Sequence, residues 1–127
     1  MGIFHELVRS EEIVIHKMGL FEIPFNSIKL GRKIVEVRLY DEKRRKLNIG
    51  DKIEFVQIPD KNDAVTVKVT GLRNYNTFKE MYEDISPSDL DTVGESVEEM
   101  VENTYKIYTP EKEKEWGTLA ISVKLEA

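Results

Sequence analysis

The feature that most constrains the fold is a strict two-residue alternation of side chains over residues 34–40, IVEVRLY. In an extended chain, alternate side chains point to opposite faces, so the pattern predicts a β-strand with one face toward a core. The side chains expected on the buried face are those of Val35, Val37 and Leu39, and those expected on the opposite face are Ile34, Glu36, Arg38 and Tyr40. This segment is therefore expected in a sheet rather than in a helix.

Four further segments predict strands. A β-branched run indicates one at 13–18, and alternation indicates others at 49–58, 64–72 and 118–127. The turn residues PDKND join the second and third of these, which predicts an antiparallel hairpin. In the last segment, the side chains expected to be buried are Leu119, Ile121, Val123 and Leu125, whereas Ala120, Ser122 and Lys124 are expected to point away.

A short helix is indicated ahead of the 34–40 strand. Pro24 lies in its first turn and Gly31 just beyond its end, as helix boundaries favour. Phe21, Phe25 and Ile28 follow helical spacing, so this helix is expected to dock by one apolar edge.

Start and stop signals predict three more helices after residue 76, and residues 87–94 are typical of a loop. The signals are the capping pairs Thr77–Glu80 and Ser96–Glu99, the start at Thr109–Pro110 and the stop at Gly117. The predicted order of elements along the chain is strand, helix, three strands, helices and strand, without parallel crossover units. We therefore expect an α+β fold, a mostly antiparallel barrel-like sheet with short helices at its ends.

A chain of 127 residues accommodates one core, so we expect one domain over 13–127 and an N-terminal extension over 1–12. There is no cysteine, which excludes disulfides, thiol nucleophiles and Cys-based metal sites. The first residues do not resemble a signal peptide, and no apolar run approaches the ~20 residues that span a bilayer. We expect no membrane association and a cytoplasmic location.

Charge is distributed unevenly along the chain. Residues 29–46 hold eight Lys or Arg against three Asp or Glu, a net +5 within a chain of net charge −5. One interpretation is a face for anionic ligands and another face that maintains solubility. The other is that basic and acidic faces neutralise each other in the fold.

The sequence lacks the motifs of most familiar active sites, which excludes those sites. The two histidines, His5 and His16, have no partner at metal-ligand spacing, so no metal site is expected. No GxSxG, P-loop or GxGxxG motif occurs, and no cofactor is expected.

Lys33, Glu36 and Arg38 are the strongest candidates for a site. Arg38 and Lys33 suit a phosphate or carbonyl oxygen, and Glu36 suits an exocyclic amine or the role of general base. The alternative is that Glu36 and Arg38 form only a surface salt bridge, which contributes ~0–1 kcal/mol to stability. The periodicity of the strand alone favours this alternative. Tyr40 offers a stacking surface, and the basic run 43–46, including Arg44 and Arg45, offers phosphate contacts or only a solvated turn.

The stretch IKLGRKIVEVRLYDEKRRKLNIGDKIEF, residues 28–55, resembles the signature of the ASCH family, whose members have a PUA-like β-barrel. The pattern is G-x-K-x-x-E-x-R followed by a Gly-Asp turn, and it is filled by Gly31, Lys33, Glu36, Arg38, Gly50 and Asp51. YNTFKEMYE and IYTPEKEKEWGTLAISV resemble later parts of stand-alone bacterial and archaeal members.

The resemblance implies an RNA- or nucleotide-binding cleft lined by the G-x-K-x-x-E-x-R residues. It also implies two enzymatic alternatives, a ribonuclease or a hydrolase of N4-acetylcytidine with Lys33 and Glu36 as catalytic residues. In the amidohydrolase branch a Thr stands where this chain has Glu36, and the downstream Glu of that branch corresponds in region to Glu95. A protein-interaction module that uses the acidic helices is the third alternative.

Overall fold

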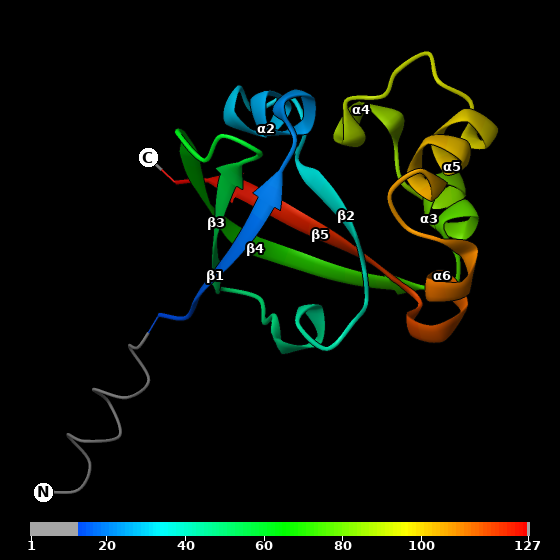
Figure 1. Ribbon diagram of the computed structural model, residues 1–127, viewed down its shortest axis with the longest axis horizontal. Helices are drawn as coiled ribbons and strands as arrows, with labels where there is room; N and C mark the ends of the chain where they lie inside the picture. Colours follow the sequence, from blue (N-terminus) through cyan, green and yellow to red (C-terminus); the bar gives the residue numbers. More distant parts are fainter. Residues whose placement is uncertain (1–12, 127) are drawn as a thin grey trace, which may run out of the picture.

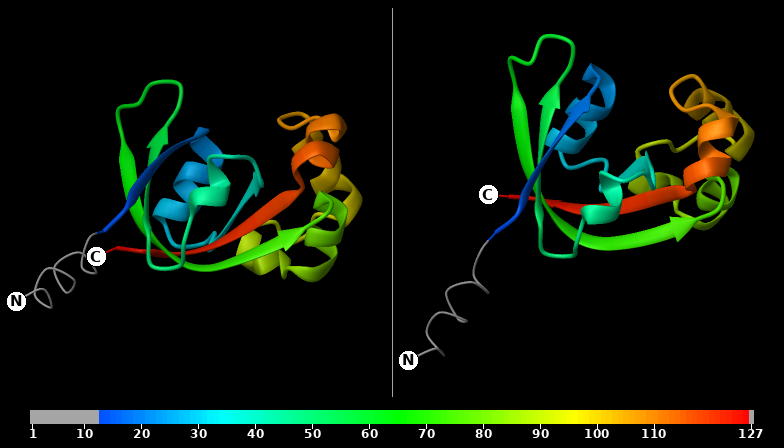
Figure 2. Two further views of the ribbon diagram at one scale, coloured as in Figure 1. Left: turned by 90° about the horizontal axis from the view of Figure 1, so that it is seen from below. Right: turned by 60° about the horizontal axis from the view of Figure 1, so that its bottom comes forward.

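The computed structural model describes residues 13–126, so the expected extension over 1–12 lies outside the described residues. Five strands form one sheet in the order β1–β3–β4–β5–β2 (Figure 1). Their bounds are β1 (Ile15–Leu20), β2 (Val35–Leu39), β3 (Lys52–Gln57), β4 (Ala64–Tyr75) and β5 (Thr118–Leu125). β1 pairs with β3 in parallel, and the other three pairs are antiparallel. The sheet curls into a half-barrel (Figure 2), which confirms the expected PUA-like α+β architecture.

Short helices lie at the ends of this sheet. They are α2 (Glu22–Lys29), α3 (Phe78–Asp84), α4 (Pro87–Leu90), α5 (Val97–Tyr105) and α6 (Pro110–Trp116), with a 3₁₀ turn, η1, at Arg44–Lys46. α2 lies beside β1 and β3, whereas α3, α5 and α6 gather where β4 ends and β5 begins (Figure 1). Within residues 13–126 no helix has the length and apolar character needed to cross a membrane.

Two apolar clusters hold the elements together. The first fills the half-barrel, where α2 contributes Phe25 and Ile28 and the strands contribute residues such as Ile53, Phe55 and Ile121. The second lies between β2 and the helices α3, α4 and α5, and its members are Val35, Leu39, Phe78, Met81, Tyr82, Ile85, Leu90, Met100 and Ala120. β2 therefore has packed structure on both of its faces.

This two-sided packing corrects the expectation for the last strand. Ala120 was expected to point away from the core, but it is fully buried in the second cluster, because helices cover that face of β5. Leu125 was expected to be buried and is 38% exposed, because it is the last residue of β5. Alternation identifies the two faces of a strand but not whether each is covered.

The expectation for the first helix was wrong at one residue. α2 begins at Glu22, so Phe21 is its N-cap residue with extended backbone dihedrals, and the Phe21 side chain is 55% exposed. Phe25 and Ile28 face the core as expected. Gly31 ends the helix with a φ of +77°, a conformation that glycine adopts without the Cβ clash of other residues.

The strand expected at 13–18 occurs two residues later, as β1. The segment 87–94 was expected to be a loop, but residues 87–90 form α4, which packs Leu90 against the second cluster. A helix of four residues has no readable periodicity, so only its packing reveals it.

The predicted N-cap residues are in place, but of the two expected capping boxes only the one at Ser96 is reciprocal. The Thr77 hydroxyl accepts a hydrogen bond from the Glu80 N–H, and Ser96 and Glu99 form the reciprocal capping box. The Gly50–Asp51 turn also occurs as expected, and the Asp51 carboxylate accepts from the Asn48 N–H. The same carboxylate lies 2.8 Å from His16 Nε2, which ties the turn to β1.

Candidate functional site

Lys33, Glu36 and Arg38 form one buried ionic cluster on β2 and the turn before it. Lys33 Nζ lies 2.9 Å from Glu36 Oε1, and Arg38 Nε donates to Glu36 Oε2 at 2.8 Å. Glu36 is 3% exposed and Arg38 8% exposed, so the alternative of a solvent-exposed salt bridge is wrong. Both oxygens of the Glu36 carboxylate are held by cations.

The turn that carries Lys33 is fixed by the backbone after α2. The N–H groups of Arg32 and Lys33 both donate to the Ser27 carbonyl, at 2.9 and 3.0 Å. The Ser27 hydroxyl donates to the Asp91 carboxylate at 2.8 Å, which attaches the turn to the end of α4. Asp91 also accepts from Arg32 Nε at 3.3 Å. These contacts place the Lys33 side chain at the junction of α2, β2 and α4.

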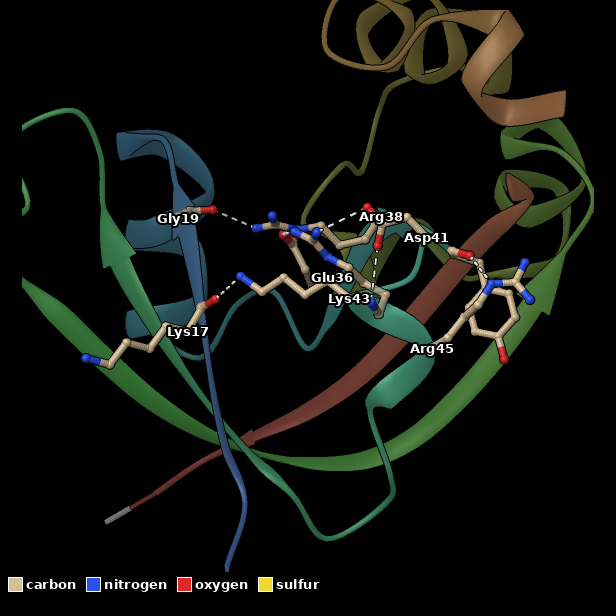
Figure 3. Close-up of polar contacts among 9 residues, drawn as sticks. Lys17, Gly19, Glu36, Arg38, Asp41, Lys43 and Arg45 are labelled. Atoms are coloured by element: carbon tan, nitrogen blue, oxygen red, sulfur yellow. Dashed lines mark hydrogen bonds and ion pairs between the residues drawn. The ribbon is translucent and has the colours of Figure 1, made fainter. Parts of the chain in front are cut away.

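Arg38 connects the two outer strands of the half-barrel. Its Nη2 donates to the Gly19 carbonyl on β1 at 2.7 Å, while its Nε remains on Glu36 (Figure 3). The guanidinium carbon lies 6.0 Å from the centre of the Phe55 ring. Since β1 and β2 do not pair through their backbones, the Arg38 side chain closes the gap between them.

A pocket of about 360 Å³ opens above this cluster, between the β1–α2 connection and the helices α4 and α5. This volume falls within the range of small-molecule sites, ~300–1,000 Å³. Its lining combines the ionic cluster with apolar and aromatic side chains, among them Leu20, Phe21, Val37, Tyr82, Met100, Ile107 and Tyr108. Polar groups converge on it from Thr92, Glu95, Asn103 and Thr104.

Comparison with known proteins identifies the family of this chain. The family model of the ASCH domain matches residues 18–127. The chain belongs to the ASCH family. This family is commonly thought to bind RNA. The chain matches none of the curated proteins with which it was compared.

Solved structures agree with this assignment. The crystal structure of the hypothetical protein PH0355 is 38% identical, with a TM-score of 0.79 over 89% of this chain and 100% of that one. The solution structure of PF0455 from Pyrococcus furiosus is 37% identical, with a TM-score of 0.70 over 88% and 97%. The ASCH protein of Zymomonas mobilis shares the fold at 13% identity, with a TM-score of 0.57 over 87% of this chain and 66% of that one.

In this ASCH domain the neighbouring cations control the pKa of the Glu36 carboxylate. Burial acts to raise the pKa of Glu36, but the charges and hydrogen bonds of Lys33 and Arg38 outweigh burial and hold that pKa below its ordinary value. A carboxylate with a lowered pKa and two occupied oxygens is a poor general base at neutral pH. The geometry therefore favours a positioning role, in which Glu36 orients the two cations.

Two tyrosines of the ASCH pocket remain protonated at neutral pH. Burial raises the pKa of Tyr82 to about 12, and its hydroxyl lies 2.7 Å from the Thr104 hydroxyl. Burial also raises the pKa of Tyr108, although the positive charge of Arg38 opposes that effect. Both phenols are thus neutral hydrogen-bonding groups on an otherwise apolar wall.

The remaining predicted site residues lie outside the pocket. Arg44 pairs with Asp41 through Nη1 at 3.3 Å. The Arg45 guanidinium lies over the Tyr40 ring at 4.3 Å and donates to the Tyr40 carbonyl at 2.8 Å. The structure thus brings Lys33, Glu36 and Arg38 together and places Tyr40, Arg44 and Arg45 outside the pocket, with Arg44 partly buried beside Asp41 and Arg45 exposed over the Tyr40 ring.

Sequence reasoning missed several pocket residues. Phe21, expected on the docked apolar edge of the first helix, lines the pocket, and Tyr108 lines it as well. Asn103, Thr104 and Ile107 were not singled out, although their spacing places them along one side of α5 and the turn after it. Nothing in the sequence indicates that this side faces a cavity rather than solvent, because the cavity exists only where α5 meets β2.

Proposed function

We propose that this ASCH domain binds single-stranded RNA or a nucleotide by accepting one base into the pocket above Lys33, Glu36 and Arg38. The observation that carries the proposal is the position of a buried ionic cluster, two cations held by one carboxylate, at the floor of a mostly apolar cavity. A planar base with polar edges requires this combination of apolar walls and a few fixed polar groups.

The cations retain donors for a ligand. Lys33 has three N–H groups and Arg38 has five, and Glu36 and Gly19 engage only part of them. Both side chains line the cavity, so the remaining donors suit carbonyl oxygens of a base or oxygens of a phosphate. Glu36 fixes the direction of both cations, which reduces the entropy that ligand binding costs.

Aromatic side chains supply the walls. Phe21 is 55% exposed and lines the cavity at the start of α2, and Tyr108 lines it from the turn before α6. Stacking of a base on an aromatic ring is worth ~1–3 kcal/mol in single-strand binding. An exposed phenylalanine at the mouth of a pocket is consistent with such a contact.

The binding proposal predicts that Lys33→Met weakens RNA binding at least about tenfold, because a hydrogen bond to a charged group contributes ~1.5–3 kcal/mol. The measurement is fluorescence anisotropy with a panel of labelled oligoribonucleotides at low salt. Lys79→Met is the matched control, since Lys79 is exposed on α3 and its replacement removes the same charge.

A thermal melt of each variant separates binding from folding. Absence of binding by the parent protein to the whole panel and to mononucleotides at low salt would refute the proposal. Equal affinities of the folded Lys33→Met variant and the parent would do so as well.

A second candidate function is hydrolysis of the acetyl amide of N4-acetylcytidine, and the position of Glu95 favours it. The Glu95 side chain lines the same pocket as Lys33, whereas both oxygens of Glu36 are engaged by cations. In this reaction Lys33 would stabilise the oxyanion and Glu95 would activate water.

This candidate predicts that the parent protein converts N4-acetylcytidine to cytidine and that Glu95→Gln reduces the rate by ~10²-fold or more, the lower end for loss of a general base. Chromatography of the nucleosides is the measurement, and Glu98→Gln on α5 is the matched control. If concentrated parent protein yields no cytidine, the hydrolase candidate is excluded. An RNA oligonucleotide included in the same incubation tests the ribonuclease alternative.

A further inference from the structure

A second, shallower groove lies where the turn after β2 meets the end of α6. Its volume is about 510 Å³, and its lining residues are Leu39, Asp41, Glu42, Lys43, Lys46, Lys112 and Trp116. Three lysines and a partly exposed tryptophan form its chemically distinctive part. None of these four side chains lines the pocket above β2.

Lys43 connects this groove to the pocket. Its Nζ donates to the Lys17 carbonyl on β1, two residues from the Gly19 carbonyl that accepts from Arg38 (Figure 3). Desolvation lowers the pKa of Lys43, and the neighbouring charges of Arg44 and Arg38 lower it further. Cations from the pocket and the groove are therefore adjacent, and an anion between them would relieve their repulsion.

An ordered stack lies at the edge of the groove. The Arg45 guanidinium lies 4.3 Å from the centre of the Tyr40 ring and 5.8 Å from that of Trp116. It also donates to the carbonyls of Tyr40 and Trp116, at 2.8 and 3.3 Å. Arg45 is exposed, so the stack presents a flat cationic and aromatic surface to solvent.

We propose that this groove binds the phosphodiester backbone and the flanking base of the same single-stranded RNA whose neighbouring base enters the pocket. The backbone passes over Lys43 and continues along Lys46 and Lys112, and the flanking base stacks on Trp116. The inference rests on the proposed function, and it extends the binding site from one nucleotide to a short single strand.

The groove lining holds three lysines against two carboxylates, Asp41 and Glu42, and this net charge of +1 favours an anionic ligand. Asp41 already receives two hydrogen bonds from Arg44, through its backbone N–H at 3.1 Å and Nη1 at 3.3 Å. Lys112 is only loosely paired, at 3.6 Å from the Glu115 carboxylate, and its side chain is 59% exposed. A nucleic-acid backbone, which carries one charge per nucleotide, can therefore pair with Lys112 without breaking a tight ion pair.

The only tryptophan of the chain, Trp116, reports directly on occupancy of the groove. Oligoribonucleotides of one base type and increasing length should quench its fluorescence, whereas the corresponding mononucleotide, which fills the pocket alone, should not. Quenching by the mononucleotide to the same extent as by the oligonucleotides would overturn the proposal.

Charge-matched variants test the backbone contacts. Lys46→Ala with Lys112→Ala should reduce the salt dependence of oligonucleotide binding by about 1.4, because each phosphate contact contributes about 0.7 on a single strand. Lys79→Ala with Lys124→Ala removes the same charge at two other exposed positions and should leave the slope unchanged. Trp116→Leu should weaken oligonucleotide binding about fivefold or more, the lower end for loss of one stacked base.

Mononucleotide affinity separates this inference from the proposed function. If the groove variants weaken the oligonucleotide and leave the mononucleotide unchanged, both proposals are supported. If oligonucleotide and mononucleotide bind equally tightly and neither responds to the groove variants, the groove proposal fails and the pocket stands. If neither the oligonucleotides nor the mononucleotide bind to the folded protein, both proposals fail.

Discussion

Glu36→Gln is expected to lower the free energy of unfolding by about 3–5 kcal/mol, with a fall in Tm of about 10–20 °C. The carboxylate is 3% exposed and is the shared anion of Lys33 and Arg38. Glutamine keeps the shape but removes the charge, so two cations would remain close together in a desolvated site without their anion. Chemical and thermal denaturation measure this loss.

Glu54→Gln is the matched control for that substitution. Glu54 lies on β3, is about one-third exposed, and pairs with Lys17 at 3.7 Å. A pair of this kind contributes ~0–1 kcal/mol, so the control should differ little from the parent protein. Equal small losses in both variants would show that the buried cluster does not stabilise the fold.

The stability effect of Glu36 also has a predicted pH dependence. Its pKa in the folded state lies below the ordinary value of 4.5, so its contribution to stability is complete above about pH 4.5. The contribution declines as the pH falls toward the lowered pKa and is lost below it. The difference between the parent protein and Glu36→Gln should therefore narrow with acidification below pH 4.5, as denaturation across that range would measure. A constant difference would contradict the assignment.

Phe25→Ala is expected to cost about 3–5 kcal/mol, the range for removal of a buried phenylalanine. Phe25 is fully buried in the half-barrel and joins α2 to the strands beneath it. Truncation leaves a cavity beneath α2. Because this short helix is held by few side chains, it cannot shift to fill the cavity well. Denaturation measures the loss, and local hydrogen exchange should increase first in α2.

Phe21→Ala is the matched control four residues earlier. Its side chain is 55% exposed at the mouth of the pocket, so stability should change by no more than ~0.5 kcal/mol. RNA or nucleotide affinity should fall by ~1 kcal/mol or more if the ring stacks on a base. A large stability loss without any loss of affinity would contradict the assignment of Phe21 to the ligand.

The buried cluster connects fold and function. Buried ion pairs rarely stabilise a fold more than apolar side chains of similar volume would. Lys33→Met, Glu36→Leu and Arg38→Met combined would therefore be less destabilising than Glu36→Gln alone, while nucleotide binding is lost. This outcome would indicate that the cluster is retained for its ligand rather than for stability.

The alternation of residues 34–40 and the helix-cap signals determined several elements of local structure without any tertiary information. They predicted the strand that carries Glu36 and Arg38, the helix stop at Gly31, and the capping box at Ser96, because local backbone geometry decides all three. The resemblance to the ASCH signature, through its G-x-K-x-x-E-x-R motif, also grouped Lys33 with Glu36 and Arg38. These features depend on neighbours within a few positions along the chain.

Only the tertiary structure decided what surrounds that strand. Alternation distinguishes the two faces of β2 but cannot show that the half-barrel covers one face and α3, α4 and α5 cover the other. Burial turns an ion pair worth little at a surface into a desolvated cluster, and it is imposed by segments remote in sequence. The pocket above the cluster and the groove beside Trp116 arise in the same way, since each forms between elements whose separation along the chain no local pattern encodes.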